Sequence, residues 1–258
     1  MTAILVDVDG VLHVSGEPVR GAGSAVARLR AAGYRIRFVT NNTTRARAEL
    51  AGDLRALGVE LADDELQTTP RAAARELAGR RVLVLAMAAV RPDLEGVDLV
   101  EEGADAVLVG GCDEGAETGD VFAYGALNRA FLELDRGAEL FCLHKNRWWQ
   151  TSRGPLLDAG AFVAGLEYAA ERDATVLGKP SAPYFEAALE AIDSRPAEAW
   201  MVGDDVEADV GGAQRCGLRG VLVRTGKFRQ GAVARSGVEP HAVLDSIADL
   251  PDYLARCA

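Results

Sequence analysis

Four short polar clusters, each directly after an apolar run, contain the residue types that phosphoryl transfer through an aspartyl phosphate requires. That chemistry needs a carboxylate nucleophile, a carboxylic acid that moves a proton, donors and a cation for the phosphoryl oxygens, and carboxylates that hold a divalent metal. The sequence supplies all of these groups in order. The clusters are Asp7-Val8-Asp9-Gly10, Thr40-Asn41-Asn42, Gly178-Lys179-Pro180, and Gly203-Asp204-Asp205 followed by Asp209.

The first cluster places two carboxylates on one side of an extended segment. Asp7 and Asp9 are two residues apart, so their side chains point the same way, and Gly10 permits a sharp turn after them. One carboxylate can attack phosphorus while the other moves a proton. The same residues also fit a solvated turn. A calcium loop does not fit, because it needs a further Asp or Asn before the glycine and a later bidentate Glu.

The second and third clusters offer groups that bind phosphoryl oxygens. The Thr40 hydroxyl and the backbone N–H groups of the turn through Asn41 and Asn42 are suitable donors, although such a triplet is also a common turn or helix cap. Lys179 follows a strand-like run and can shield the charge between a nucleophile and a phosphate. A surface lysine is the alternative interpretation.

The fourth cluster is the strongest single indication of a metal site. Asp204, Asp205 and Asp209 place three carboxylates within six residues, and such groups repel one another unless a cation compensates. We expect Mg²⁺ here, with Asp204 as a direct ligand because it is nearest to the strand end. Asp205 and Asp209 are expected to act through water or through another ligand. The alternative is a set of carboxylates that stabilises a helix N-terminus.

Alternating strand and helix patterns at both ends of the chain predict an α/β fold with a parallel sheet. In such sheets the ligand lies beyond the carboxyl ends of the strands, which is where the four clusters fall. We therefore expect a Rossmann-like three-layer α/β/α core. The predicted strands are Ala3–Val8, Ile36–Thr40, Ala174–Leu177, Ala199–Val202 and Gly220–Val223, and the predicted helices are Val26–Ala32, Arg45–Leu57, Tyr184–Ile192 and Val206–Cys216.

The stretch between the second and third clusters predicts an inserted α/β domain over residues 77–175, so that the core comprises 1–76 and 176–258. The segment 110–120 is expected to be a loop, because it is rich in glycine and acidic residues. The predicted strands of the insert are Arg81–Ala86, Ala106–Val109 and Glu139–Leu143, and its predicted helices are Val121–Leu134 and Asp158–Ala170.

The insert contains candidates for substrate contacts. His144, Lys145 and Trp148 combine cations with an aromatic side chain after a predicted strand, and such a segment can grip an anionic or planar substrate. A packed aromatic loop is an equal alternative. Asp158 is a further candidate, with a helix cap as its alternative role.

Composition limits the partners and the compartment. The net charge of −11 argues against a nucleic-acid partner, and the longest apolar run, Val82–Val90, is far shorter than the ~20 residues that span a bilayer. Neither a signal peptide nor a CxxC or Cys/His metal pattern is evident. We expect a soluble cytoplasmic protein with no membrane partner and with structural cysteines, namely Cys112, Cys142, Cys216 and Cys257. Motifs of phosphate-loop kinases, serine hydrolases and zinc proteases are absent.

The four clusters, read as DVDGVL, VTNN, GKP and GDDVEADV, resemble the four motifs of haloacid dehalogenase superfamily phosphatases. The position of the insert resembles the C2-capped, NagD-like branch (subfamily IIA). Within it, Val202–Arg229, LHKNRWW and LEYA resemble the phosphatases of phospholysine, phosphohistidine and inorganic pyrophosphate. The resemblance implies an α/β cap domain that closes over the site and selects substrates, and a homodimer formed through the cap.

The resemblance also implies a role for each core residue. Asp7 would be the nucleophile that forms the aspartyl phosphate, and Asp9 would protonate the leaving group and then activate water. Thr40 and Asn41, with the turn at Asn42, would bind the phosphoryl group, and Lys179 would hold its charge. Mg²⁺ would be bound by Asp7, by the backbone carbonyl of Asp9 and by Asp204.

The expected activity is therefore Mg²⁺-dependent hydrolysis of a small phosphorylated metabolite, a phosphomonoester. Hydrolysis of inorganic pyrophosphate or phosphoamidates is the alternative. Asp9 favours esters, because an alkoxide leaving group needs a proton and the phospholysine subgroup often lacks this second aspartate. A receiver-type or phosphate-binding protein is the alternative without catalysis. A receiver domain would have its lysine late in a chain about half this length, with nothing inserted.

Overall fold

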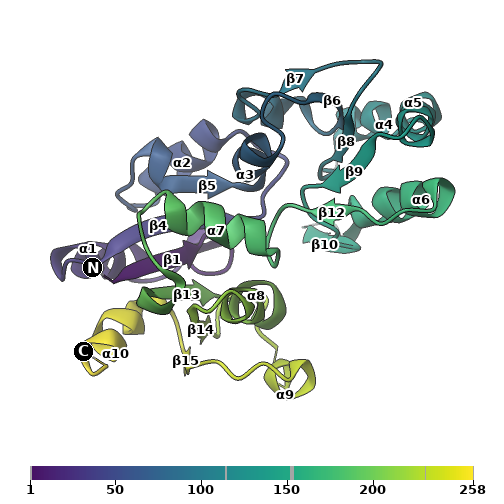
Figure 1. The fold of residues 1–258 in the computed structure, drawn as a ribbon. Helices are drawn as coiled ribbons and strands as arrows, with labels where there is room; N and C mark the ends of the chain where they lie inside the picture. The colour runs from purple at the N-terminus through teal and green to yellow at the C-terminus, as the bar shows by residue number, and fades with distance from the viewer. Residues whose placement is uncertain (1, 114, 152–153, 230, 258) are drawn as a thin grey trace. The chain divides into compact units, whose positions relative to one another are not determined.

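The structure is a computed structural model that describes residues 2–113, 115–151, 154–229 and 231–257. The chain forms two compact units, which are described separately (Figure 1). The first unit, called the core, comprises Met1–Thr40, Ala48–Gln67 and Lys179–Ala258, and the second comprises Asn41–Arg47 and Thr68–Gly178. The second unit therefore contains the turn after Thr40, together with a helix that precedes the sequence-based boundary at residue 77.

A six-stranded sheet forms the centre of the core, with strand order β15-β14-β13-β1-β4-β5. The pairs β1–β4, β1–β13, β13–β14 and β14–β15 are parallel. All residues of β1 are buried, as expected for a strand covered on both faces. The strands are β1 (Ala3–Asp7), β4 (Arg35–Thr40), β5 (Leu66–Thr68), β13 (Ala199–Gly203), β14 (Arg219–Val223) and β15 (Ala242–Leu244).

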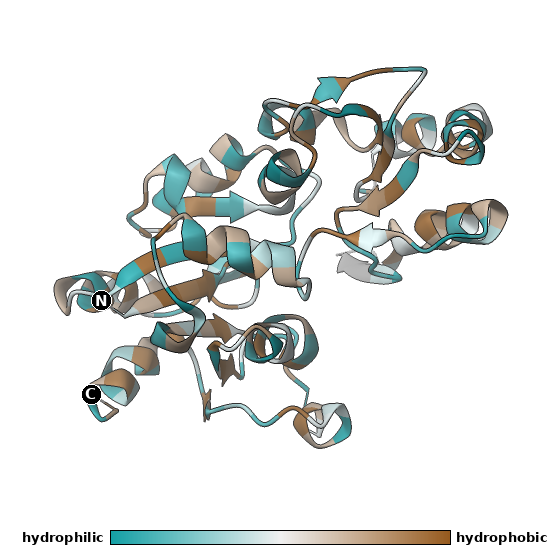
Figure 2. Cartoon of the chain, viewed as in Figure 1, coloured by the Kyte–Doolittle hydropathy of each residue, from teal (hydrophilic) through white to brown (hydrophobic). Residues whose placement is uncertain are grey.

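Helices cover both faces of this sheet. On one face, Ile4 and Val6 of β1 share a hydrophobic cluster with Leu29 of α1 and Leu254 of α10. On the other face, Val210 packs in a cluster with Leu222 of β14. Figure 2 shows the hydrophobic colouring of β1 and β14 that these clusters require. The helices are α1 (Ala22–Ala31), α2 (Arg47–Ala56), α7 (Ala182–Glu190), the π-helical η4 (Val206–Gly211), α8 (Gly212–Arg215), α9 (Ala232–Ser236) and α10 (Leu250–Ala255).

The second unit is built around a five-stranded sheet, with strand order β12-β9-β8-β6-β7 and parallel pairing throughout. Helices α5 and α6 pack on one face and α3 packs on the other. The strands of this sheet are β6 (Arg81–Leu85), β7 (Asp98–Leu99), β8 (Ala106–Val109), β9 (Glu139–Cys142) and β12 (Thr175–Val176). The helices are α3 (Thr69–Glu76), α4 (Ala116–Val121), α5 (Tyr124–Asp135) and α6 (Gly160–Ala170). A separate antiparallel pair is formed by β10 (Trp148–Thr151) and β11 (Gly154–Leu157).

The predicted α/β class, with helices around parallel sheets, is confirmed, but four local predictions differ from the structure in detail. The strand predicted over 174–177 as part of the core sheet is β12, which pairs with β9 in the second unit. The loop predicted over 110–120 contains the start of α4, because Thr118 bonds back to Asp113 and Glu117 accepts the Ala88 N–H. The helix predicted over 121–134 is interrupted between α4 and α5, and the helix predicted over 206–216 begins as a π-helix.

Short elements were not predicted at all. Hairpin strands β2 (His13–Val14) and β3 (Glu17–Pro18) have two residues each, too few for a recognisable alternation.

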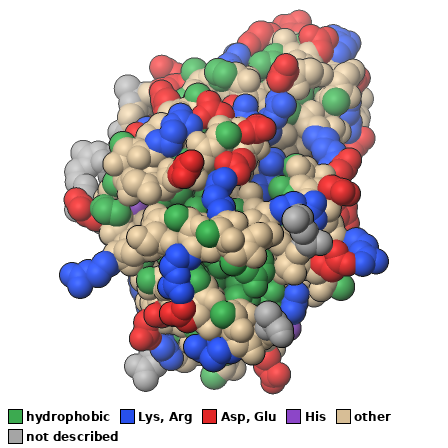
Figure 3. All heavy atoms as spheres, turned by 90° about the vertical axis from the view of Figure 1, so that its left-hand side faces the viewer, with side chains coloured by type: hydrophobic (Ala, Val, Ile, Leu, Met, Phe, Trp, Pro, Cys, Tyr) green, Lys and Arg blue, Asp and Glu red, His purple; other side chains and the backbone are tan. Residues whose placement is uncertain are grey.

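Acidic and basic side chains are interspersed on the face shown in Figure 3. In the part of the chain that the structure describes, none of the helices combines the length and the apolar character needed to span a membrane.

Candidate active site

Three strand ends and one following segment position the polar clusters of the core. Asp7 is the last residue of β1, Thr40 is the last residue of β4, and Asp204 directly follows β13. The parallel register of β1 with its two neighbours brings these carboxyl ends to one edge of the sheet. Lys179 begins the last stretch of the core and leads into α7.

A buried ammonium group lies between two buried carboxylates. The Nζ of Lys179 is 2.5 Å from Asp7 Oδ1 and 2.8 Å from Asp209 Oδ1. Burial alone would lower the pKa of Lys179, but the carboxylates of Asp209 and Asp7 raise it well above its ordinary value. Burial and the charge of Asp209 likewise raise the pKa of Asp7 well above its usual range, against the effect of Lys179. The group therefore holds more negative charge than one lysine neutralises.

Asp204 completes a group of three carboxylates. Asp7, Asp204 and Asp209 each offer one oxygen, and these oxygens lie within 4.8 Å of one another. The Oδ1 of Asp204 is buried and has no hydrogen-bond partner among the residues that the structure describes, and burial together with Asp209 raises the pKa of Asp204 to about 6. Converging buried carboxylates, one of which has an oxygen without a donor, suit a hard divalent cation such as Mg²⁺. The residues present therefore fit the divalent metal that the sequence predicts.

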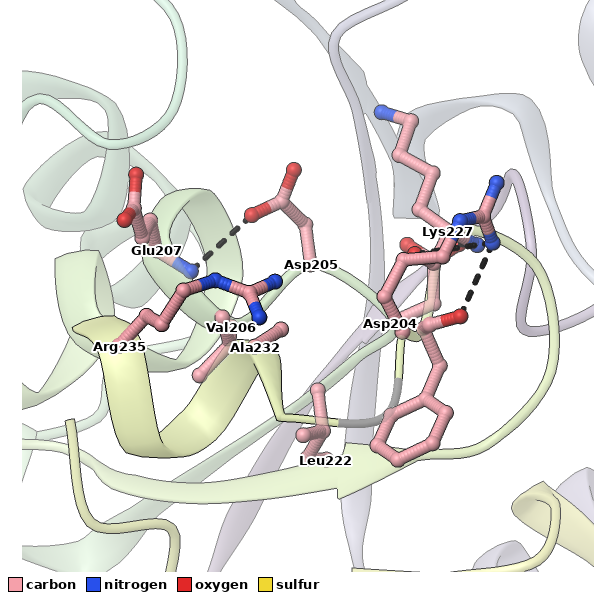
Figure 4. Close-up of a pocket in the computed structure, with 10 residues that line it drawn as sticks. Asp204, Asp205, Val206, Glu207, Leu222, Lys227, Ala232 and Arg235 are labelled. Carbon is pink, nitrogen blue, oxygen red and sulfur yellow. Dashed lines mark hydrogen bonds between the residues drawn. The ribbon is translucent and has the colours of Figure 1, made fainter. Parts of the chain in front are cut away.

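The π-helical turn after β13 brings Asp209 to this group. The side chain of Asp205 accepts the N–H groups of Glu207 and Ala208 at 3.0 and 2.9 Å, and its own N–H donates to Asp209 Oδ2 at 3.1 Å. In Figure 4, Asp205 points toward the backbone of Glu207. Asp205 thus orients Asp209 and contributes no oxygen to the carboxylate group, whereas Asp209 does. A π-helical turn often marks a functional site.

A segment that the sequence analysis missed closes against Asp204. The backbone N–H of Lys227 donates to Asp204 Oδ2 at 2.6 Å, and the Thr225 hydroxyl donates to the carbonyl oxygen of Gly10. Burial opposes protonation of the Lys227 side chain, but Asp7 and Asp204 raise its pKa. The sequence did contain a signal for this segment. Like the four polar clusters, Thr225-Gly226-Lys227 comes shortly after an apolar run, the one that forms β14.

Two glycines are required for this close approach. A Cβ atom on Gly10, which has φ of 87°, would lie 1.9 Å from Asp204 Oδ2. A Cβ atom on Gly226, which has φ of 61°, would lie 2.0 Å from the same oxygen. Both the backbone conformation and the space therefore demand glycine.

Lys227 and Asp204 also line a pocket of about 200 Å³. Figure 4 shows this pocket, whose lining also includes Val206 and Glu207 of the π-helical turn, Leu222 and Arg235. Its walls carry both acidic and basic side chains, so it has no single charge preference.

Asp9 lies at the exposed side of the site. The Thr40 hydroxyl donates to Asp9 Oδ2 at 3.0 Å, which links the first two clusters as predicted from their strand ends. The backbone N–H of Thr40 donates to the hydroxyl of Tyr184 at 2.9 Å, and that hydroxyl also lies within hydrogen-bond distance of the carbonyl oxygens of Thr40 and Gln67. Tyr184 is fully buried and fixes the position of Thr40. The sequence carried no signal for this contact, which spans 144 residues.

Asn41 and Asn42 follow Thr40 in the chain and belong to the second unit. Asn41 Oδ1 accepts a hydrogen bond from the Thr69 hydroxyl at 3.3 Å. Asn42 Oδ1 accepts the N–H groups of Thr44 and Arg45 at 3.1 and 3.2 Å, so this side chain stabilises the turn.

The candidates of the insert separate into buried and exposed residues. His144 and Asp158 are buried, with His144 Nδ1 3.8 Å from Asp158 Oδ2 and its Nε2 2.9 Å from the Thr43 hydroxyl. Lys145 pairs with Glu167 at 2.6 Å on the surface. The side chain of Trp148 is 58% exposed.

Comparison with known proteins finds relatives that match along nearly the whole chain. Residues 4–100 match the family described as haloacid dehalogenase-like hydrolase, and residues 176–250 match the family described as HAD-hydrolase-like. The human haloacid dehalogenase-like hydrolase domain-containing protein 2 is 38% identical over 99% of this chain and 96% of its own length. The human phospholysine phosphohistidine inorganic pyrophosphate phosphatase is 37% identical over 99% of this chain and 94% of its own length.

Solved structures share the fold. A p-nitrophenyl phosphatase from Archaeoglobus fulgidus is 26% identical and superposes with a TM-score of 0.90 over 98% of both chains. A glycerol phosphate phosphatase from Mycobacterium tuberculosis, solved with magnesium, is 28% identical with a TM-score of 0.84 over 96% of this chain and 76% of that one. NagD from E. coli K-12 shares the fold at 24% identity, with a TM-score of 0.86 over 96% of this chain and 98% of NagD.

Proposed function

This chain belongs to the haloacid dehalogenase-like hydrolase family and is one of its phosphatases, and from this premise we propose that it hydrolyses small-molecule phosphomonoesters through an aspartyl phosphate, with Mg²⁺ as its cofactor. One observation carries the proposal. The strand-end carboxylate of Asp7 lies against the ammonium group of Lys179, within a buried group of carboxylates that includes Asp204 and its unpartnered oxygen.

Asp7 is the nucleophile of the proposed reaction. It lies at the end of a fully buried strand, so its position is fixed before substrate binds. Lys179 screens the carboxylate from the negative charge of an approaching phosphoryl group. Asp7, Asp204 and Asp209, with the backbone carbonyl of Asp9, would hold Mg²⁺. When bound, the ion neutralises these carboxylates and polarises a phosphoryl oxygen.

Asp9 is the acid and base of the proposed reaction. As Asp7 attacks phosphorus, the bond to the leaving oxygen breaks, and that oxygen takes a proton from Asp9. In the second step Asp9 takes a proton from the water that attacks the aspartyl phosphate. The exposure of Asp9 and its hydrogen bond to Thr40 suit a group that exchanges protons with substrate and water. Thr40 and the backbone at Asn41 and Asn42 bind the phosphoryl oxygens.

Inorganic pyrophosphate and phosphoamidates are a second candidate substrate class. The name of the relative that is 37% identical supports this class. The names of the solved p-nitrophenyl and glycerol phosphate phosphatases support esters. Because Asp9 is retained, we favour esters, whose leaving alkoxide needs a proton.

We further propose that residues 77–175 form a cap that closes over the site and selects the phosphorylated metabolite, with His144, Lys145, Trp148 and Asp158 as candidates for this selection.

We also propose a homodimer formed through this cap. Trp148 and Leu157 support the dimer, because they pair across the β10–β11 hairpin and are 58% and 57% exposed. Light scattering of the purified protein tests the proposed dimer, and a monomer at high concentration would contradict it.

The four free cysteines fit the proposed cytoplasmic location.

Phosphate release tests the proposed function. The protein is assayed with phosphomonoesters, pyrophosphate and phosphoamidates, with Mg²⁺ or with EDTA, beside the Asp7→Asn variant. We expect Mg²⁺-dependent release that is fastest for phosphomonoesters and is lost in the variant. Release that persists in EDTA or in the variant would contradict the mechanism, and preferred turnover of pyrophosphate would select the second substrate class.

A further inference from the structure

A short hairpin directly after Asp9 places a histidine beside the proposed acid and base. The hairpin consists of β2 and β3, and His13 is the first residue of β2. Its backbone is tied to the first cluster, because the N–H of Gly10 donates to the carbonyl oxygen of His13 at 2.7 Å and Asp9 forms a β-bridge with His13. The histidine is thus fixed relative to Asp9 by backbone contacts.

One ring nitrogen of His13 is oriented by the hairpin turn. The N–H of Gly16 donates to His13 Nδ1 at 3.4 Å. A ring nitrogen that accepts a hydrogen bond carries no proton, so the neutral ring has its proton on Nε2. This Nε2 lies 3.6 Å from Asp9 Oδ1. The hairpin therefore presents an N–H group to the carboxylate.

The two oxygens of Asp9 face different donors. Oδ2 accepts the hydroxyl of Thr40 at 3.0 Å, and Oδ1 faces His13. The Asp9 side chain is 50% exposed, so packing alone does not fix the rotation of its carboxyl group, whereas the His13 side chain is only 18% exposed. The hydrogen bond to Oδ2 and the ring N–H that faces Oδ1 together favour one orientation of this half-exposed carboxyl group.

We propose that His13 is a positioning residue for Asp9, and that its Nε2–H group holds the carboxyl group in the orientation that transfers a proton to the leaving oxygen of the substrate. This inference rests on the proposed function. His13 itself forms no bond to phosphorus and transfers no proton. It is needed only when the leaving group needs the proton, so it biases the enzyme toward alkyl phosphates, whose alkoxides leave poorly without protonation.

Two variants separate this role from simple packing. His13→Phe keeps a planar ring in the same space but removes the donor, and His13→Gln removes the ring but keeps an amide N–H donor. Each is assayed at one fixed pH and saturating Mg²⁺ with glycerol 3-phosphate, which has a poor leaving group, and with p-nitrophenyl phosphate, which has a good one. Thermal unfolding of both variants shows whether the fold is intact.

We expect His13→Phe to lower kcat for glycerol 3-phosphate about tenfold, a fraction of what a positioned acid contributes, while its KM changes less than about twofold and kcat/KM for p-nitrophenyl phosphate, which reports only the first step, is nearly unchanged. We expect His13→Gln to recover most of the loss. Equal effects of His13→Phe on both substrates, or no effect on either, would overturn the inference alone. A wild-type protein that hydrolyses neither substrate would overturn the proposed function and this inference with it.

Discussion

Replacing Gly226 with alanine should disable the carboxylate group far more than its cost in global stability explains. The new Cβ atom would lie 2.0 Å from Asp204 Oδ2 and 2.5 Å from the Cα of Gly10. Non-bonded Cβ contacts below 3.0 Å do not occur in real structures, so the oxygen or the backbone must shift by at least 3.0 − 2.0 = 1.0 Å. A shift of about 1 Å in a catalytic group is enough to lower the rate about 100-fold.

Gly237 provides the matched control. Its φ of 68° is close to that of Gly226, but a Cβ atom there would meet no atom of the described residues within 4 Å. Both substitutions carry the cost of a left-handed conformation, about 1–2 kcal/mol. Only Gly226→Ala displaces Asp204. The difference between the two variants therefore isolates the effect on the site.

The assay measures kcat/KM, the Mg²⁺ concentration that gives half-maximal activity, and the free energy of unfolding in urea. We expect Gly226→Ala to lose about 100-fold in kcat/KM and to need more Mg²⁺, and Gly237→Ala to keep wild-type values of both. Both should lose about 1–2 kcal/mol of stability, with any excess in Gly226→Ala reporting the local strain. Equal activity of the two variants would refute the argument that glycine is required for the position of Asp204.

Three further outcomes follow from the charges of the site and of the second unit. Asp9→Asn should abolish leaving-group release from alkyl phosphates but spare the first-turnover release of p-nitrophenol, and equal loss of this first step for both substrates would contradict its role as the acid. In the metal-free protein the raised pKa of Asp204, about 6, means that its contribution to stability is complete below about pH 4 and is lost as the pH rises through 6. Asp204→Asn should therefore stabilise the metal-free protein at pH 7, by an amount on the order of 2 kcal/mol in urea unfolding, and should remove the stabilisation by Mg²⁺; an unchanged or lower stability would contradict this. Glu133 is buried and accepts the N–H groups of Gly103 and Ala104; burial raises its pKa, but these bonds and Arg136 bring it below the ordinary value of 4.5. Its contribution is thus present above about pH 4.5 and lost as the pH falls, so urea unfolding of Glu133→Gln should show a weaker acid dependence than the wild type, and parallel curves would contradict this.

The sequence predicts residues whose position follows from a local signal. Asp7, Thr40 and Asp204 each come directly after an apolar run, and the carboxyl ends of parallel strands must meet at one edge of the sheet. The same rule predicts the class of fold. It does not predict which sheet a two-residue strand joins. The apolar run before Gly178 was therefore correctly predicted to be a strand, β12, but was assigned to the core sheet, whereas it pairs with β9 in the second unit.

Residues that act through distant contacts carry no such signal. The side chain of Tyr184 supports Thr40 across 144 positions, and a tyrosine on a helix reads only as a core residue. His13 lies on strands of two residues, which are shorter than any period a pattern can reveal.

The four recognisable clusters provide the reacting groups, and the residues that sequence reasoning missed hold those groups in place. Lys227 supplies a backbone N–H group to Asp204, Tyr184 accepts the N–H group of Thr40, and His13 faces Asp9. The first two contacts join segments that only the folded chain brings together, and the third depends on a hairpin too short to recognise in the sequence. Substitutions at the clusters should therefore remove the chemical step itself. Substitutions at the supporting residues should instead change its geometry, and with it the dependence of the rate on the leaving group or on the metal.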